Sequence, residues 1–243
     1  MRSSYSSTTT NSPTASFITS SWLKWLAIAS MLIDHLGAVL LEPWLMTGGG
    51  LAAHSDIDWI LVDSILRLIG RLAFPLYSFL IVEGYHHTRD VRRYATRLAL
   101  FALISEIPFN LAISQNWSDL SHQNVFFTLL AGLLAIWAMD QLKTWPLRLL
   151  LVGGLILGAE WLMTDYGAYG VLLIVILHWT RSDRRQQALV GALYNLRQLT
   201  ASLAVLPIYF YNGQKGRSSG KWIYLIYPVH LMVYALIYRI WLR

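Results

Sequence analysis

The chain contains no cysteine among its 243 residues. This absence excludes disulfide bonds, metal sites built on thiolates and a cysteine nucleophile. Charge is also scarce, because Asp, Glu, Lys and Arg make up 13% of the sequence, whereas a soluble domain carries about 25%. Hydrophobic residues make up 56%. The shortage of charge and the excess of apolar residues together predict a membrane protein with several spans.

Motifs of two common ligand sites are missing as well. The sequence has no His-x-x-x-His pair and no glycine loop of the kind that binds nucleotide phosphates, so we expect no metal. The net charge of +6 does not indicate a nucleic-acid partner, because the cations fall in short loops between apolar runs. Such a distribution is typical of membrane proteins, whose cytoplasmic loops collect Lys and Arg.

Eight apolar runs predict the fold. A helix needs about 20 apolar residues to cross the hydrocarbon core of a bilayer. We therefore expect an all-α integral membrane bundle of about eight transmembrane helices, between seven and nine, in contact with membrane lipid. It would form one transmembrane domain over residues 22–243, after a disordered, Ser/Thr-rich cytoplasmic tail over residues 1–21. The runs cover residues 22–41, 57–83, 95–113, 124–142, 146–163, 168–180, 186–211 and 221–241.

Loop charges predict the orientation. The loops after the second, fourth and sixth runs carry Lys and Arg, while the intervening loops carry Asp and Glu, which places the amino terminus in the cytoplasm. The loop at 212–221 breaks this pattern, because Lys215, Arg217 and Lys221 lie on the side that eight spans would make external. Either the number of spans is wrong near 186–211, or these cations are retained there for binding.

The first span contains three ionisable residues, Lys24, Asp34 and His35. An ionisable side chain at the centre of a membrane helix costs about 2.5–3.5 kcal/mol on insertion scales, so it marks a candidate functional site. Eleven residues correspond to about three helical turns, which puts Lys24 and His35 on one face, about 16 Å apart along the axis. This spacing suits a group that holds a charged donor near the surface and a group that does chemistry deeper in.

Other spans also contain polar residues that lipid would not accept. Two pairs, Arg67 with Arg71 and Glu106 with Asn110, are four residues apart and so share a helix face. We expect these side chains to face one common cavity, although buried pairs of opposite charge also occur for structural reasons and Arg67 has an equal chance of reaching the surface. The polar residues of the later spans are Arg67, Arg71, Glu83, Glu106, Asn110, Asn124, Tyr227 and His230.

This inventory is compatible with two kinds of chemistry. An intramembrane histidine flanked by carboxylates can serve as the general base of an acyl transfer, because its ordinary pKa lies near neutrality. Cytoplasmic arginines and Lys24 are suited to the phosphates of a coenzyme A thioester. The same residues also fit a proton relay in a transporter. Transporters often contain internal repeats, and the first span has no counterpart in the second half, which favours an enzyme.

Ordered motifs run through nearly the whole chain after the tail, from about Lys24 to Tyr238. They are K-x10-H with Asp before the His, IGRLAFPLYSFLIVEGYHHTRD, RYATRLALFALISEIPFNL, NVFFTLLAGLL, DYGAYGVL, YNGQKGR and YLIYPVHLM. This pattern resembles the TraX family of pilin acetylases. The resemblance implies a bacterial inner-membrane protein that acetylates the amino terminus of conjugative pilin. It also implies a distant relation to larger membrane acyltransferases, whose first helix carries a basic residue, ten spacers and a histidine. Lys24 and His35 would be that pair.

The resemblance and the residues together give a hypothesis for the site. Acetyl-CoA would be the acyl donor, and His35 would be the base, oriented by Glu106 or Glu83. Asp34 belongs to this catalytic group but lies about 100° around the helix from His35, so we do not expect it to bond the ring. Arg71 and Asn124 would stabilise the oxyanion. Residues expected to bind the donor are Lys24, Arg89, Arg92, Arg93, Arg184 and Arg185, and those expected to bind the acceptor are Asn110, Tyr227 and His230.

Three alternatives to pilin acetylation are compatible with the sequence. The acceptor is then a hydroxyl of a cell-envelope glycan, or the protein is a proton-coupled transporter, or it is a non-catalytic factor of pilus assembly. The first alternative would use the same residues and differ only in the acceptor. The last leaves the buried charges without a role.

Overall fold

The computed structural model describes residues 17–48, 57–217 and 220–241. This described part consists of helices and short connections and contains no β-sheet. The predicted all-α membrane bundle is therefore confirmed. The longer helices are α1 (Ser20–Leu36), α4 (Trp59–Gly70), α5 (Ala73–His87), α6 (Val91–Ile113), α7 (Val125–Gln141), α8 (Trp145–Trp161), α9 (Gly167–Trp179), α10 (Arg184–Tyr194) and α13 (Ile226–Trp241). The shorter ones are α2 (Glu42–Met46), α11 (Leu199–Ser202), α12 (Val205–Tyr209), a π-helix (Gly37–Leu41) and a 3-10 helix (Lys221–Leu225).

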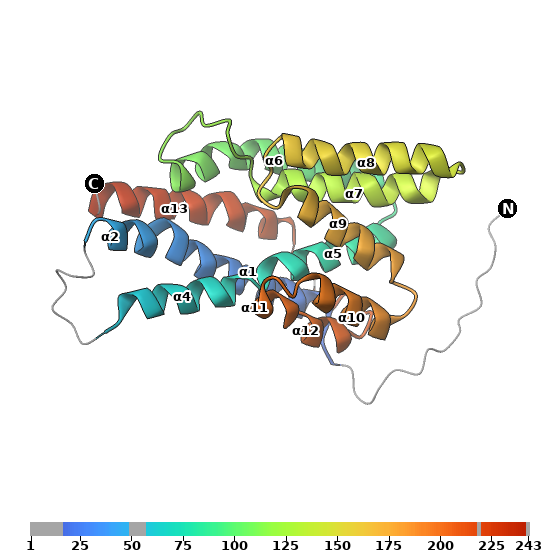
Figure 1. The fold of residues 1–243 in the computed structure, drawn as a ribbon, viewed down its shortest axis with the longest axis horizontal. Coiled ribbons are helices and arrows are strands. Elements are labelled where there is room, and N and C mark those ends of the chain that lie inside the picture. The colour runs from blue at the N-terminus through green and yellow to red at the C-terminus, as the bar shows by residue number, and fades with distance from the viewer. Residues whose placement is uncertain (1–16, 49–56, 218–219, 242–243) are drawn as a thin grey trace.

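Among the described residues, four helical segments are long and apolar enough to cross a membrane: Ser20–Met46, Trp59–His87, Val91–Ile113 and Trp222–Trp241. In Figure 1 they run along the long axis of the molecule, and α7, α8 and α9 pack beside them. Leucine and isoleucine side chains fill the interior, while many large apolar side chains lie exposed on the outside. An apolar exterior is expected for helices that face lipid rather than water.

Charged loops gather at two opposite ends of the bundle. At the first, which we call the basic end, α5, α7 and α9 end and α6, α8 and α10 begin (Figure 1, right). It carries most of the loop arginines and lysines. At the other, the acidic end, the connection between α6 and α7 pairs with the connection between α8 and α9. The backbone N–H of Gln123 donates to the carbonyl of Met163 at 3.0 Å, and the N–H of Asp165 donates to the carbonyl of Gln123 at 2.8 Å.

Residues 184–209 form a hairpin and not the seventh crossing that the apolar run at 186–211 predicts. Both of its ends lie at the basic end, because the Arg184 guanidinium sits over the ring of Tyr211 at 5.1 Å. Its tip lies deeper in the bundle, where the hydroxyl of Tyr169 donates to Asn195 at 2.6 Å. The loop after the hairpin therefore returns to the basic end, and the cation Lys215 lies on the side that the positive-inside rule requires. The structure therefore supports the first of the two explanations left open by the sequence, in which the predicted number of spans near 186–211 is wrong.

The amino-terminal end of α1 is fixed by that same loop. The N–H groups of Ser20 and Ser21 donate to the carbonyls of Gln214 and Lys215 at 2.9 and 3.1 Å. Most of the predicted tail, residues 1–16, lies outside the described residues, and its last residues belong to the fold.

Two helix irregularities shape the interior. The second span is broken between α4 and α5, which leaves Arg71 at the junction. The first span changes from α-helix to π-helix after Leu36, and Pro43 follows near the start of α2. A proline ring clashes with the carbonyl four residues earlier, so a wider turn before it relieves the clash. Turns of the π-helical type are frequent at functional sites. This one begins at Gly37, two residues after His35.

Candidate functional site

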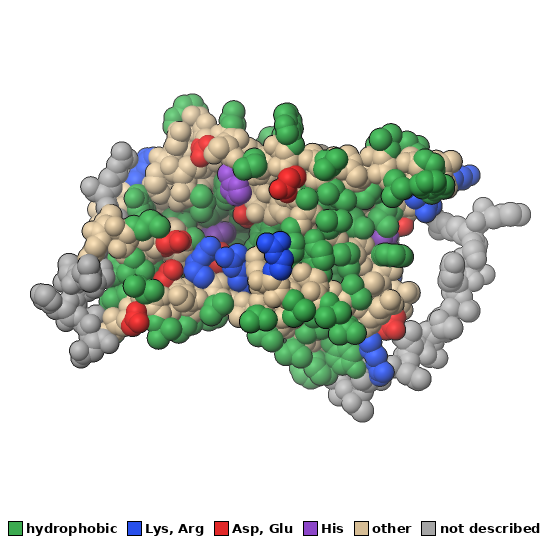
Figure 2. All heavy atoms as spheres, viewed as in Figure 1, with side chains coloured by type: hydrophobic (Ala, Val, Ile, Leu, Met, Phe, Trp, Pro, Cys, Tyr) green, Lys and Arg blue, Asp and Glu red, His purple; other side chains and the backbone are tan. Residues whose placement is uncertain are grey.

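A cavity of about 900 Å³ lies between α1, the α4–α5 junction, the loops of the acidic end and the tip of the hairpin. We call it the His35 cavity. Figure 2 shows charged and histidine side chains gathered in the middle of this face, surrounded by hydrophobic ones. The ionisable residues among its lining are Asp34, His35, Glu42, Arg67, Arg71, His122, Glu160, Asp165 and Arg197, together with the tyrosines Tyr77, Tyr166, Tyr169 and Tyr227.

His35 is paired with a second histidine from the last helix. Its Nδ1 lies 2.6 Å from Nε2 of His230, and the two rings stack at an angle of 8°. Nδ1 of His230 lies 2.7 Å from the carbonyl oxygen of Ile226. A carbonyl only accepts hydrogen bonds, so His230 carries its proton on Nδ1 and its Nε2 is an acceptor. His35 must then donate from Nδ1, which leaves its Nε2 unprotonated.

The free Nε2 makes His35 suited to proton abstraction. Within the described residues, Nε2 of His35 has no hydrogen bond or ion pair, and the residue lines the cavity. In general, the bond made by one ring nitrogen sets the tautomer and leaves the other nitrogen for chemistry. Here that bond is to His230, and neither of the predicted carboxylates makes it. His230 was expected to bind the acceptor, but the structure places it directly behind His35.

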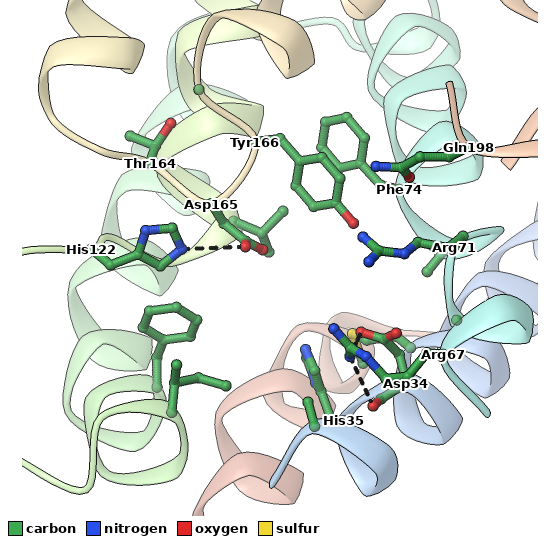
Figure 3. A pocket seen from close by; sticks show the side chains of 18 of the residues that line it. Asp34, His35, Arg67, Arg71, Phe74, His122, Thr164, Asp165, Tyr166 and Gln198 are labelled. Carbon is green, nitrogen blue, oxygen red and sulfur yellow. Dashed lines mark hydrogen bonds and ion pairs between the residues drawn. The ribbon is translucent and has the colours of Figure 1, made fainter. Parts of the chain in front are cut away.

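Asp34 pairs with Arg67 and, as expected, not with the His35 ring. Its Oδ2 lies 2.8 Å from Nη1 of Arg67, which also donates to the Asp34 carbonyl at 3.2 Å. Two glycines make room for this ion pair. A Cβ on Gly37 would lie 3.1 Å from Cδ of Arg67, and a Cβ on Gly70 would overlap the Asp34 carboxylate. Figure 3 shows the pair at one edge of the cavity, beside His35.

Arg71 points into the cavity from the α4–α5 junction. Figure 3 shows its guanidinium aimed at the open space between the Asp34–Arg67 pair and Tyr166. The ring of Tyr166 stacks on that of Phe74 with centroids 3.5 Å apart. This aromatic pair forms the wall behind the guanidinium, and Gln198 from the hairpin tip lies next to it.

His122 and Asp165 face these groups from the opposite wall (Figure 3). Nε2 of His122 lies 3.5 Å from Oδ1 of Asp165. The backbone pairing of the two acidic-end loops at Gln123 brings the two residues together. The carboxylate of Asp165 raises the pKa of His122, although partial burial opposes the shift. The protonated form of His122 is thereby favoured.

A second cavity, of about 480 Å³, opens at the basic end. We call it the Lys24 cavity. Its lining includes Lys24, His87, Thr88, Arg97 and Lys215. Glu83 also lines it, but its carboxylate is paired with Arg181 and Arg184, so the cations of the lining remain available to an anion.

The two cavities adjoin each other. Four residues line both of them: Met31, Tyr77, Val125 and Tyr227. The Tyr77 hydroxyl lies 3.7 Å from the Met31 sulfur, so side chains from α1 and α5 meet in this shared wall. The predicted pair of Lys24 and His35 is thus divided between the two cavities, one residue in each, and the wall lies between them.

Glu83 lies too far toward the basic end to orient His35. Its Oε1 is 3.4 Å from Nε of Arg181 and 3.4 Å from Nη2 of Arg184, and it is only 3% exposed. The prediction that Glu83 positions the base is therefore not supported by its contacts. Arg184, expected to bind the donor, is occupied with Glu83 and with Gln187, whose Oε1 accepts from it at 2.5 Å.

Glu106, Asn110 and Asn124 do not line the His35 cavity. Asn124 caps α7 by accepting from the N–H of Phe126, and its Nδ2 donates to Glu106 at 2.5 Å and to the Ala102 carbonyl at 2.8 Å. Its amide is therefore not available as an oxyanion donor. Glu106, expected to orient His35, instead fixes this cap, and Asn110 is buried away from both cavities.

The remaining predicted donor-binding arginines lie on the surface of the basic end. Arg89, Arg92, Arg93 and Arg185 are exposed, and Arg93 pairs with Asp90 at 3.0 Å. None of them lines the Lys24 cavity. Arg97, one turn further along α6 and not predicted, does so.

Sequence reasoning missed several residues of the His35 cavity, namely Tyr77, His122, Tyr166, Arg197 and Gln198. Two signals were present. Arg197 and Gln198 interrupt an apolar run, which indicates a break at depth, and Asp165 and Tyr166 belong to the motif DYGAYGVL. His122 gave no signal of its own, because it lies in a polar loop and reaches the cavity through loop pairing.

No solved structure matches the chain. A probable fimbrial assembly protein FimC, serogroup H1, from Dichelobacter nodosus is 30% identical over 239 residues, which cover 86% of this chain and 91% of the relative. Residues 19–238 match the family model described as TraX protein, and this match takes in every residue that lines the two cavities. The chain belongs to the TraX family.

Proposed function

We propose that the chain is a membrane acetyltransferase of pilus biogenesis, which transfers an acetyl group from acetyl-CoA to the amino terminus of a pilin subunit. The basic end would face the cytoplasm of a bacterium and the acidic end the outside of the inner membrane. A role connected with pili is supported by the TraX family and by the name of the fimbrial assembly relative.

One observation carries the proposal of chemistry. His35 presents an unprotonated Nε2 to a large cavity, while its other nitrogen is held by His230 at 2.6 Å. A general base needs this combination of a free nitrogen and a fixed ring. A purely structural histidine in a membrane helix would have both nitrogens satisfied, because unpaired polar groups are costly there.

The two cavities give the substrates separate entrances. Acetyl-CoA, whose phosphates carry negative charge, would enter the Lys24 cavity from the cytoplasm and be held by Lys24, Arg97 and Lys215. The acceptor would enter the His35 cavity from the acidic end. The acetyl group would meet the acceptor at the shared wall, where Met31, Tyr77, Val125 and Tyr227 line both cavities.

The reaction would use the residues of the His35 cavity in order. Nε2 of His35 takes a proton from the acceptor amine as its nitrogen bonds to the thioester carbonyl carbon. The carbon–sulfur bond then breaks, and the proton passes from His35 to the departing thiolate, which leaves as coenzyme A. His230 stabilises the imidazolium through Nδ1–H of His35. The N–H groups of Arg67 that do not bond Asp34 would stabilise the oxyanion, an effect of about 3–4 kcal/mol for one donor in other enzymes.

The mass of pilin shows whether its amino terminus is acetylated, and this tests the proposed reaction. Pilin would be isolated from cells that express the native chain, His35→Gln or His178→Gln as the sole copy. His178 is a matched control because it also stacks on a second histidine, His86, but lies at the basic end. We expect an acetylated amino terminus with the native chain and with His178→Gln, and an unmodified one with His35→Gln at equal protein abundance. Acetylation that persists with His35→Gln would contradict the role of the base.

The name of the fimbrial relative equally supports a non-catalytic assembly factor. That function predicts that pilin is never acetylated but that pilus assembly still needs the chain. Purified protein incubated with labelled acetyl-CoA and separate pilin and envelope-glycan acceptors distinguishes the remaining cases. Label on the glycan would mean that the same mechanism acts on a glycan hydroxyl and not on pilin. If neither acceptor is labelled, the assembly factor or the proton-coupled transporter is favoured.

A further inference from the structure

We propose that Arg71 and Arg197 form a binding site for an anionic group, a carboxylate or a phosphate, on an amphiphilic acyl acceptor. That the ligand is the acceptor rests on the proposed function, whereas the anion site itself does not. The two arginines come from different parts of the chain. Arg71 lies at the α4–α5 junction and Arg197 at the tip of the hairpin, and both line the His35 cavity.

The described carboxylates of the cavity are not paired with these two cations. Asp34 is paired with Arg67 at 2.8 Å and Asp165 with His122 at 3.5 Å. The carboxylate of Glu160 accepts from the backbone N–H of Ala168 at 2.8 Å.

Three charged side chains of the described lining then have no hydrogen bond or ion pair to another described residue: Arg71, Arg197 and Glu42. Glu42 lies on α2, outside the helix junction and hairpin that carry the two arginines. No carboxylate of the described lining is therefore paired with either arginine.

An unpaired guanidinium is costly at the position of Arg71, which is partly buried, whereas Arg197 is exposed to the cavity and its surroundings. Arginine keeps its proton at every relevant pH, so Arg71 cannot avoid the cost by becoming neutral. Ionisable groups within membrane segments normally pair with one another or mark a substrate pathway. Since no described carboxylate forms an ion pair with Arg71, an anionic ligand would supply the missing pair. The fork of N–H donors fits carboxylates and phosphates in two-point contacts.

The hairpin holds Arg197 in position for this ligand. The side chain of the neighbouring Asn195 accepts from the Tyr169 hydroxyl at 2.6 Å and donates to the Gly191 carbonyl at 2.6 Å. These bonds fix the tip against α9. Binding then requires little ordering of the tip, and a preorganised site loses less entropy when its ligand binds.

The anion in this cavity is not expected to come from the acyl donor. Coenzyme A phosphates have their own cations in the Lys24 cavity, on the far side of the shared wall. The His35 cavity also has apolar lining, including Met31, Phe74 and Phe109. A ligand that fits both features is an amphiphile with an anionic head, such as a membrane-inserted acceptor with an acidic group near the reacting nucleophile.

Binding of simple amphiphiles tests the site without requiring catalysis. The probes are dodecyl phosphate and dodecanoate, with dodecanol as the uncharged comparison, titrated into the purified full chain in a nonionic detergent. Arg197→Gln is the test variant, and Arg239→Gln on α13 is the control that removes an arginine outside both cavities. Arg197→Lys keeps the charge but not the fork.

We expect at least one anionic probe to bind the native chain and Arg239→Gln with equal affinity. The same probe should bind Arg197→Gln about tenfold more weakly, and its affinity for Arg197→Lys should lie in between. Preference for one probe identifies phosphate or carboxylate as the source. Equal binding to Arg197→Gln, or binding of dodecanol as tight as that of the anions, would overturn the site. If Arg197→Gln does not fold, Arg197→Lys decides alone, and unchanged affinity there overturns the fork geometry.

Kinetics connect the site to the acceptor. Arg197→Gln should raise KM for the acceptor while leaving kcat and KM for acetyl-CoA unchanged, because the arginine binds a part of the acceptor that does not react. A raised KM for acetyl-CoA instead would assign the anion to the donor and refute the proposal. An arginine-dependent anion site in a protein that transfers no acetyl group would refute only the proposed function.

Discussion

Two histidine pairs in this protein have nearly the same geometry and very different surroundings. His35 and His230 stack at 8° with centroids 4.9 Å apart, and His86 and His178 stack at 11° with centroids 5.1 Å apart. In each pair one ring is oriented from behind. The Ile226 carbonyl accepts from His230, and the Asp140 carboxylate lies 3.1 Å from Nε2 of His178.

The surroundings decide what each pair can do. His35 lines a large cavity next to arginines and an aromatic wall, and its partner is buried. His86 is exposed at the basic end and lines neither of the two cavities. By geometry alone the second pair resembles a catalytic arrangement more closely, because it includes a carboxylate. A relay of hydrogen bonds therefore does not identify a site unless a substrate-sized space adjoins it.

The largest effect should come from removing the ring behind the base. His230→Phe leaves Nδ1–H of His35 without an acceptor, so the tautomer with a free Nε2 is no longer favoured. We expect acetyl transfer to fall about a hundredfold or more, and His230→Gln, whose amide oxygen can accept, to lose less. The matched change in the other pair, His178→Phe, should leave the rate within about twofold. Equal rates of labelled acetyl transfer for the two phenylalanine variants would remove the distinction between the pairs.

Some of this distinction was visible in the sequence. The cost of charge in a membrane helix identified Asp34, His35 and Arg71, and all three line one cavity. The same cost does not reveal which partner each charge has, so Glu83 was assigned to the base although it binds arginines at the basic end. Asn124 was misassigned for a related reason, because a polar residue at the start of a span serves equally as a helix cap.

The hairpin at 184–209 shows a second limit of sequence reasoning. The apolar run at 186–211 is long enough for a crossing helix although polar residues interrupt it, and an apolar run does not show whether the chain returns. The cations of the next loop contained that information, since they contradict a crossing under the positive-inside rule. The contribution of Arg197 and Gln198 to the site followed only from the three-dimensional path.

A smaller effect should follow from adding a methyl group next to the Asp34–Arg67 ion pair of the His35 cavity. In Gly70→Ala the added methyl group overlaps the Asp34 carboxylate and separates it from Arg67. We expect a loss of about 1–3 kcal/mol in stability, typical of overpacking, together with slower acetyl transfer. Gly154→Ala is the control, because nothing lies within 4 Å of a Cβ there. The measurements are thermal unfolding in detergent and the rate of acetyl transfer. If Gly70→Ala is as stable and as active as Gly154→Ala, the ion pair is dispensable.

On the basic-end pair, Asp140→Ala should affect stability only. The variant removes the acceptor of the Tyr85 hydroxyl at 2.9 Å and the partner of His178. Because Asp140 is 41% exposed, solvent replaces part of both bonds, and we expect a loss of no more than about 1 kcal/mol in stability. Acetyl transfer should be unchanged. A fall in the transfer rate without a fall in protein abundance would show that this second pair takes part in the chemistry.

The smallest effect concerns the histidine–carboxylate pair of the His35 cavity, His122 with Asp165, which tests whether this cavity responds to pH. The pKa of His122 is raised, chiefly by Asp165, so the folded state binds this proton more tightly than the unfolded state. The stabilisation is therefore complete below the ordinary histidine pKa and is lost as pH rises through the raised value. Because both side chains are partly exposed, the change should be small. The melting temperature of the native chain should accordingly fall slightly more than that of His122→Gln between about pH 6 and pH 8. Parallel curves for the two proteins would show that the pair does not contribute to stability, and that the acidic-end wall keeps its structure without it.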